Sequence, residues 1–373
     1  MRPPRRTNST QWMVVAAAAV LAILVVAGLM WSRLANRNAV PAATHGNTSV
    51  HEYGPPPAAV PVFFLEDPEH QGWYVGLDWS GNPRGTIKLA QPLDQGTILV
   101  QSPNGSAFQV TPGGKGVSTQ FLDRLGRTVS GTGGTWADDN LHTCSVSQDT
   151  HMTWTLTTGG PGQTSKAVGV VAQDAAVGQT VIDVAACSFK NDRAILVRTS
   201  VAWPSEVWVI RLSDGAVLAH NAIQNAKQLV DVIASADGSL IAENSGQWTG
   251  GAGNGAPATV IRRLSDGAVV TTLDPSMGVL GFSSDNKVAL VGVAPWVAGT
   301  ASHLGLVDVG TGHVLWRYDG GDQLAGFFAD PSGSGVAVLL QPVNAPGPHP
   351  SVKVILVSGN GSSTTMPGPY ERP

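Results

Sequence analysis

Charged residues are scarce in this sequence, since Asp, Glu, Lys and Arg make up 13% of its 373 residues. Amphipathic helices are scarce too: outside residues 12–31, no long stretch repeats apolar residues at i, i+3, i+4 and i+7. Glycine and proline are instead abundant, with 45 and 25 residues. Many short strands joined by tight turns fit this composition, so we expect an all-β fold.

Positive charge is in short supply outside the first residues of the chain. Three of the 22 Lys and Arg residues lie within residues 1–11, which leaves 19 basic against 26 acidic residues, a balance of −7. A domain of this sign lacks the basic surface that nucleic acids require. We therefore expect no nucleic-acid partner.

Long hydrophobic runs are absent except at residues 12–31, which contain no charge and carry a tryptophan at each end. A helix of ~20 residues spans the ~30 Å hydrocarbon layer of a membrane, and indole rings favour its interfaces. Three arginines precede the run and two follow it. Because positive charge favours the cytoplasmic side, this predicts a single-pass cell-membrane protein with its N-terminus inside.

A cleaved signal peptide is the alternative, with residues 39–43 as the cleavage point. Such peptides have an apolar core of ~7–15 residues, and the run here is longer, which favours an uncleaved anchor. The expected organisation is a short cytoplasmic tail (1–11), a transmembrane anchor (12–31), a flexible stalk (32–59) and an extracytoplasmic all-β domain (60–373).

The all-β domain contains a recurring pair of hairpins. The second hairpin of the pair occurs in three copies, two with a Ser-Asp-Gly turn and one with a Gly-Thr-Gly turn. The final glycines of these turns are 52 and 45 residues apart, at Gly215, Gly267 and Gly312. Asp-Gly tolerates the positive φ angles that tight hairpin turns need. Four strands repeating every ~40–50 residues is the spacing of β-propeller blades.

The repeat predicts a β-propeller, with seven blades favoured and six as the alternative. Residues 60–90 supply three strands, and a strand near residues 362–366 is expected to join them and close the seventh blade. Closure of this kind removes exposed sheet edges. The other six blades are expected at residues 94–131, 132–178, 179–225, 226–275, 276–320 and 321–358.

These turns resemble those of the bacterial WD-repeat-like and quinoprotein-like (YVTN-type) β-propeller superfamily, over about residues 60–373. Asp308, Thr311-Gly312 and Trp316 are similar to the tryptophan docking motif of pyrroloquinoline-quinone-type blades. The resemblance implies that Thr-Gly makes the turn and that Trp packs against the neighbouring blade. The other copies lack this Trp, so the resemblance concerns blade architecture, and we expect no cofactor.

The sequence has only two cysteines, Cys144 and Cys187, and they lie about one blade apart. Cys144 is expected on the second strand of one blade and Cys187 on the first strand of the next, where neighbouring blades pack face to face. Outside the cytoplasm this favours a disulfide. Two separate buried thiols are the alternative.

Motifs for catalysis and metal binding are absent. No histidine pair has the spacing of a zinc protease, and His142 with Cys144 supplies only two ligands, so we expect no metal site. No Gly-x-Ser-x-Gly elbow is present. The acidic clusters at residues 138–140 and 319–322 are interpreted as turn residues. We therefore assign no catalytic residue.

Three tryptophans recur in equivalent loops. Trp203, Trp248 and Trp296 lie 45 and 48 residues apart, each between the second and third strands of a predicted blade, and the next such loop carries His349. These loops emerge on one face, where they predict an aromatic platform for a protein or carbohydrate partner. The alternative is that each Trp folds down and seals its blade.

Together these features favour a membrane-anchored, extracytoplasmic propeller that acts as a non-enzymatic binding or protein-interaction scaffold. The alternative is an extracytoplasmic propeller enzyme, either a metal-dependent hydrolase of the lactonase kind or a quinoprotein. A hydrolase would need several carboxylates around a cation at the channel.

Overall fold

The computed structural model describes residues 60–67, 70–89, 97–111, 119–173, 180–200, 206–223, 231–244, 258–293, 301–343, 351–366 and 370–371. Every regular element in this part of the chain is a strand, and all of it belongs to one compact unit. The predicted tail, anchor and stalk lie outside the described residues. Within the described ranges, no helix is long and apolar enough to cross a membrane.

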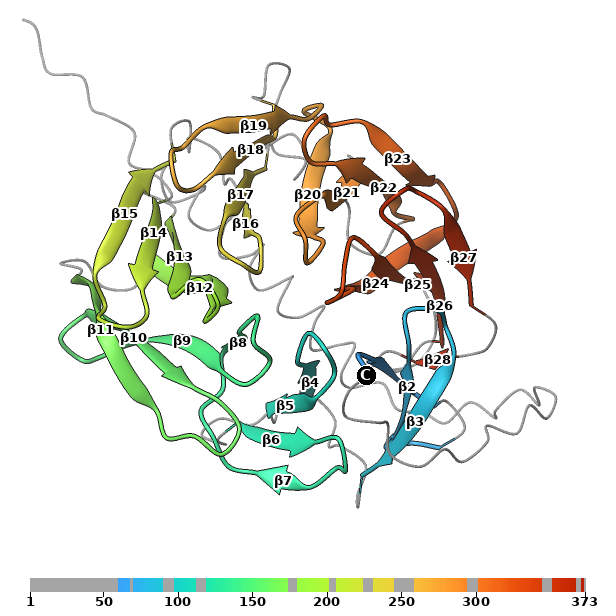
Figure 1. Ribbon diagram of the computed structural model, residues 1–373, viewed down its shortest axis with the longest axis horizontal. Coiled ribbons are helices and arrows are strands. Elements are labelled where there is room, and N and C mark those ends of the chain that lie inside the picture. Colours follow the sequence, from blue (N-terminus) through green and yellow to red (C-terminus); the bar gives the residue numbers. More distant parts are fainter. Residues whose placement is uncertain are drawn as a thin grey trace, which may run out of the picture. The chain divides into compact units, whose positions relative to one another are not determined.

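The described strands form a seven-bladed β-propeller (Figure 1). Five blades are separate four-stranded sheets, and an eight-stranded sheet contains the other two. The five separate blades are, in chain order, β4 (Ile98–Gln101), β5 (Ala107–Thr111), β6 (Gln120–Asp123) and β7 (Thr128–Val129); β8 (Thr135–Trp136), β9 (Thr143–Gln148), β10 (Thr153–Gly159) and β11 (Lys166–Gln173); β12 (Thr180–Ser188), β13 (Arg193–Ser200), β14 (Glu206–Arg211) and β15 (Val217–Ala222); β16 (Val232–Ala234), β17 (Leu240–Glu243), β18 (Val260–Arg263) and β19 (Val269–Thr272); and β20 (Met277–Phe282), β21 (Val288–Val293), β22 (His303–Asp308) and β23 (Val314–Tyr318).

All strand pairs within these blades are antiparallel, and in Figure 1 the first strand of each blade lies nearest the centre of the ring. Seven blades are therefore present in the described residues, as the repeat spacing predicted, and each of the five separate blades falls within the residues expected for it.

The remaining two blades share the eight-stranded sheet. One consists of β24 (Asp322–Ala329), β25 (Val336–Pro342), β26 (Ser351–Val357) and β27 (Ser363–Thr365). The closing blade consists of β1 (Phe63–Glu66), β2 (Trp73–Leu77) and β3 (Pro83–Lys88), joined by β28 (Tyr370–Glu371). Strands from both ends of the propeller domain thus meet in one blade.

The prediction that residues 362–366 close the seventh blade is wrong. Ser363–Thr365 is β27, which pairs with β26, and the closing strand is β28, which pairs with β1 at Glu66 and Glu371. The reason is a tight turn after β26: Gly361 has a φ of 85°, and Ser358 N donates to Ser362 O. This turn returns the chain onto β26 before it reaches the next blade.

The core lies between the blades. Middle strands such as β21 are buried along nearly their whole length, because a neighbouring blade covers each of their two faces. Between the closing blade and the β4–β7 blade, Phe64 meets Phe108 edge to face, with ring centroids 4.9 Å apart. Trp316 packs against a cluster that includes Val336 of the next blade, as the resemblance implied.

A recurring serine–aspartate network holds the turns between first and second strands. Ser235 Oγ donates to Asp237 and accepts from the backbone N–H of Leu240, and Ser283 does the same with Asp285 and Val288. The short side chains satisfy the backbone at the turn. Because this network depends on residues that are close together in the chain, the repeat can be recognised from the sequence alone.

Candidate functional site

The predicted aromatic platform lies outside the described residues. Trp203, Trp248, Trp296 and His349 all fall in ranges of which nothing is described. Their role as a contact surface for a partner stays a prediction. The site described below includes Asp192, which directly precedes β13.

A groove lies between the β8–β11 blade and the β12–β15 blade, and we call it the inter-blade groove. Its volume is about 700 Å³, within the range of ~300–1,000 Å³ that ligand sites have. Turns from both blades form its walls. The lining residues are His142, Thr158, Gly162, Gln163, Thr164, Lys166, Phe189, Asp192, Leu212 and Ser213.

A disulfide joins the two blades beside this groove. Cys144 of β9 and Cys187 of β12 are bonded to each other, and both are buried in the core cluster that the two blades share. This is the pairing that the sequence favoured. The backbone adds to the connection, because the N–H of Asp138 donates to the carbonyl of Cys187.

Asp138 holds the first turn of the neighbouring blade. Its carboxylate accepts hydrogen bonds from Ser188 Oγ at 2.7 Å and from the backbone N–H of Phe189 at 2.9 Å. Bonds to a charged acceptor are stronger than neutral ones. The turn of one blade therefore fixes the turn of the next, which positions Phe189 in the groove wall.

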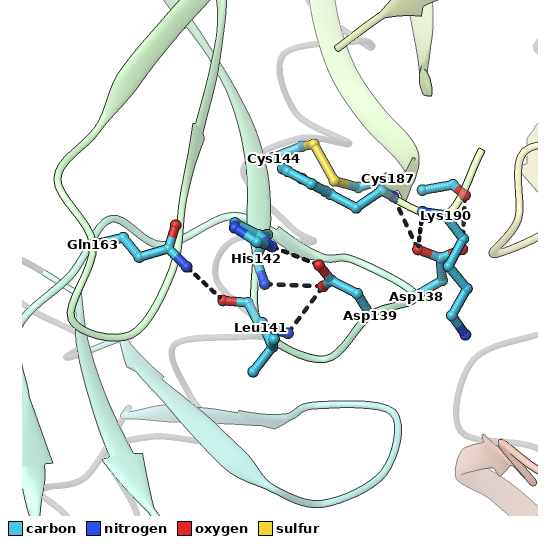
Figure 2. A network of polar contacts seen from close by, with 10 residues as sticks. Asp138, Asp139, Leu141, His142, Cys144, Gln163, Cys187 and Lys190 are labelled. Carbon is cyan, nitrogen blue, oxygen red and sulfur yellow. Dashed lines mark hydrogen bonds and ion pairs between the residues drawn. A yellow bond between two sulfur atoms is a disulfide. The ribbon is translucent and has the colours of Figure 1, made fainter. Parts of the chain in front are cut away.

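Asp139 holds its own turn and orients His142. One carboxylate oxygen accepts from the backbone N–H groups of Leu141 and His142, and the other contacts His142 Nδ1 at 2.5 Å (Figure 2). Although burial opposes it, hydrogen bonds from Leu141 and His142 lower the pKa of Asp139. The imidazole then stacks on Phe189, with ring centroids 3.9 Å apart and planes 9° from parallel.

The remaining walls are fixed by turn-to-turn hydrogen bonds. Gln163 Nε2 donates to the carbonyl of Leu141 at 3.3 Å, which ties the β10–β11 turn to the β8–β9 turn. Both carboxylate oxygens of Asp192 accept from Ser213, one from its N–H and one from its hydroxyl. Four turns from two blades are thus fixed in place, so the groove is preorganised.

Metal ligands are not assembled in this part of the molecule. The ranges given above contain no group of three or more His, Cys, Asp or Glu side chains that could hold a metal ion. Asp138 and Asp139 act as turn residues, as interpreted from the sequence. Asp319 pairs with His303, whereas Asp322 begins β24 and forms an ion pair with Lys353 at 2.5 Å.

The sequence did not predict the groove, although His142 and residues 138–140, which lie in or beside it, were considered. His142 and residues 138–140 were considered only as ligands or turn residues. Phe189, Asp192 and Ser213 come from two turns about 20 residues apart, and no spacing rule brings them together. The disulfide was the available signal, because it marks where the two blades are joined.

The Asp139 carboxylate should make the free energy of unfolding depend on pH. Its pKa is lowered in the folded state, so its stabilising contribution is complete above ~pH 4 and is lost as the pH falls through the folded pKa. We expect Asp139→Asn to lower the unfolding free energy at pH 6 by about 1–2 kcal/mol. The variant should also lose less stability than the wild type between pH 5 and pH 2.

Urea unfolding at several pH values measures both effects. Asp319→Asn is the control, because the Asp319 side chain is 68% exposed and its contact with His303 is screened by solvent. Equal acid profiles for Asp139→Asn and the wild type would show that this carboxylate does not stabilise the β8–β9 turn.

Comparison with known proteins supports the fold and no narrower assignment. No protein-family model and no curated protein sequence matches the chain. Among solved structures, a prolyl endopeptidase is 14% identical, with a TM-score of 0.50, and the match covers 83% of this chain and 48% of that one. Prolyl oligopeptidase B from Galerina marginata is 11% identical, with a TM-score of 0.50 and coverage of 80% and 49%.

The β-propeller domain of the Trilobed protease from Pyrococcus furiosus is 12% identical, with a TM-score of 0.48 and coverage of 73% and 84%. The chain spans about half the length of the two prolyl peptidases that it matches. At these identities the similarity concerns the fold. The chain is a seven-bladed β-propeller whose neighbours among solved structures are propeller proteins.

Proposed function

We propose that this propeller is a non-enzymatic binding scaffold for a protein partner, held at the cell membrane by residues 12–31 with the propeller outside the cytoplasm. The observation that carries the proposal is the inter-blade groove. Its four turns are held by hydrogen bonds, and a disulfide joins the two blades beside it. A surface that is ordered before binding loses little conformational entropy when a partner docks.

The proposed location has two supports. The apolar run at residues 12–31 is long enough to span a bilayer as a helix. The disulfide agrees with an oxidising compartment, because such bonds persist in extracytoplasmic proteins and are rare in the cytosol. Protease treatment of intact cells tests this: we expect digestion of the propeller from outside, whereas protection until lysis would contradict the proposed orientation.

The loop tryptophans are proposed as a second contact surface, for a protein or a carbohydrate. Tagged full-length protein, purified from membranes in mild detergent, is compared with a variant in which Trp203, Trp248 and Trp296 are replaced by alanine. We expect at least one partner that is enriched with the wild type and lost from the variant. Quantitative mass spectrometry gives the measurement, and an unchanged partner set would argue that these side chains are structural.

A further inference from the structure

A second pocket lies where the β24–β27 blade meets the closing blade, and we call it the junction pocket. Its volume is about 550 Å³, within the range of ~300–1,000 Å³ that ligand sites have. Three turns form it: the β2–β3 turn of the closing blade and the β24–β25 and β26–β27 turns of the neighbouring blade. Asp330 is the only ionisable side chain among the described residues that line it, so the pocket is polar and carries little charge.

Contacts between the three turns fix the shape of the junction pocket. A Cβ added at Gly359 would lie 2.3 Å from the Cβ of Ser334, so the β26–β27 and β24–β25 turns touch each other. Ser334 Oγ in turn donates to Asp285 of the preceding blade. On the other side, a Cβ added at Gly81 would lie 3.2 Å from Cε of Met366, which follows β27. The pocket is therefore ordered before a ligand arrives, which lowers the entropic cost of binding.

Trp79 brings an aromatic side chain to the junction pocket. Its ring packs against Phe63 of β1, with ring centroids 5.1 Å apart and planes 53° from parallel. Its Nε1 is shielded from solvent and has no hydrogen-bond partner among the described residues. Because Nε1 is the only polar atom of the side chain, the part that can meet a ligand is carbon. Such a surface binds the apolar C–H groups of a ligand ring.

Asp330 and Asn360 each hold a turn with one atom and leave another atom unused. Asp330 Oδ1 accepts from the N–H and the hydroxyl of Ser332, whereas its Oδ2 has no partner among the described residues. Asn360 Oδ1 accepts from the N–H of Ser362 at 2.9 Å, which fixes the amide so that Nδ2 is the unpaired end. The pocket thus offers one free carboxylate acceptor and one free amide donor beside an aromatic surface.

We infer that the junction pocket binds an uncharged saccharide. The C–H face of one sugar ring packs on Trp79, one sugar hydroxyl donates to Asp330 Oδ2, and Asn360 Nδ2 donates to another sugar oxygen. A sugar offers this combination, because its hydroxyl groups both donate and accept while one face of its ring is apolar. The inference goes beyond the proposed scaffold function and does not depend on the inter-blade groove.

The lining favours an uncharged saccharide over an anion or an apolar peptide. No lysine or arginine is among the described lining residues, so a phosphate or carboxylate would meet Asp330 without a compensating cation. Five of the described lining residues carry a hydroxyl group: Ser80, Ser334, Ser358, Ser362 and Thr364. Aliphatic side chains would strip water from these hydroxyls and give no hydrogen bond in return. Sugar hydroxyls can replace that water.

A glycan array screened with the full-length protein tests this inference. The protein is purified in a detergent without a sugar headgroup, because a glycoside detergent would compete for the pocket. We expect binding to uncharged oligosaccharides. A bound oligosaccharide is then titrated by isothermal titration calorimetry, and its Kd should change less than twofold between about 50 and 500 mM NaCl, since no ion pair forms.

Two exchanges of similar shape test the unused atoms. Asp330→Asn and Asn360→Asp each keep the oxygen that holds the turn and replace the free group, so each should weaken binding about five- to tenfold. Trp79→Leu should weaken it at least tenfold. Asp274→Asn is the matched control, because Asp274 accepts from the N–H and hydroxyl of Ser276 in the same way but lies on another blade, and it should change the Kd less than twofold.

Circular dichroism establishes that the variants are folded. No binding to any glycan, binding to charged glycans alone, or binding that the three pocket variants leave unchanged would each overturn the inference. Binding that is lost only when Trp203, Trp248 and Trp296 are replaced by alanine would assign the saccharide to the loops and would overturn it as well. A wild type that binds the saccharide through Asp330 and Asn360 but enriches no protein partner would contradict the scaffold function alone.

Discussion

Breaking the Cys144–Cys187 disulfide will lower the free energy of unfolding of the propeller by about 4 kcal/mol. The bond closes a chain segment of 43 residues, and without it the unfolded chain regains the entropy of that loop. Urea unfolding of the oxidised and the reduced protein measures the difference. Reduction separates this effect from packing, because the sulfur atoms stay in the core.

The double variant Cys144→Ala/Cys187→Ala provides the control for this experiment. It should be at least as unstable as the reduced wild type, since it also loses two buried sulfur atoms, and reductant should not change its unfolding midpoint. A wild-type protein that unfolds at the same urea concentration with and without reductant would show that the bond does not constrain the unfolded chain.

Replacing Phe64 by alanine will cost a similar amount, about 3–5 kcal/mol of unfolding free energy, which is typical of a fully buried phenylalanine. The Phe64 side chain is fully buried and meets Phe108 across the contact between the closing blade and the β4–β7 blade. Its removal leaves a cavity between β1 and the β4–β7 blade. Chemical unfolding of the variant gives the value.

Leu125→Ala is the matched control, because Leu125 is 52% exposed in a turn of the neighbouring blade. We expect its effect to stay within about 0.5 kcal/mol, as for most surface substitutions. If Phe64→Ala cost less than about 1 kcal/mol, the packing between these two blades would not contribute to the stability of the ring.

The fold was largely predictable because short stretches of sequence, the turns of the hairpins, specify its repeat. Asp-Gly and Gly-Thr-Gly turns recur at blade spacing, and each of them predicts a hairpin from its own few residues. The disulfide was predictable for a related reason: one blade of separation places Cys144 and Cys187 on facing strands.

The closing strand and the groove were not predictable in the same way. Whether residues 362–366 pair with their own blade or the next depends on the turn at Gly361, which decides how soon the chain reverses. The groove joins His142, Phe189 and Ser213 from turns of two blades. Their meeting depends on how neighbouring sheets twist and pack, and a sequence pattern carries no information about that geometry.

The way the ring closes determines how it would respond to mechanical load. β28 has two residues, and it is paired with β1 at one position and with β26 at two. Phe63 of β1 adds a ring contact to Phe328 of β24 across the same junction, with centroids 5.6 Å apart. Tension that entered the domain through the chain before β1 would act on this weakly paired junction first. The junction at β28 would separate first, and the two blades joined by the disulfide would stay folded while the ring opened.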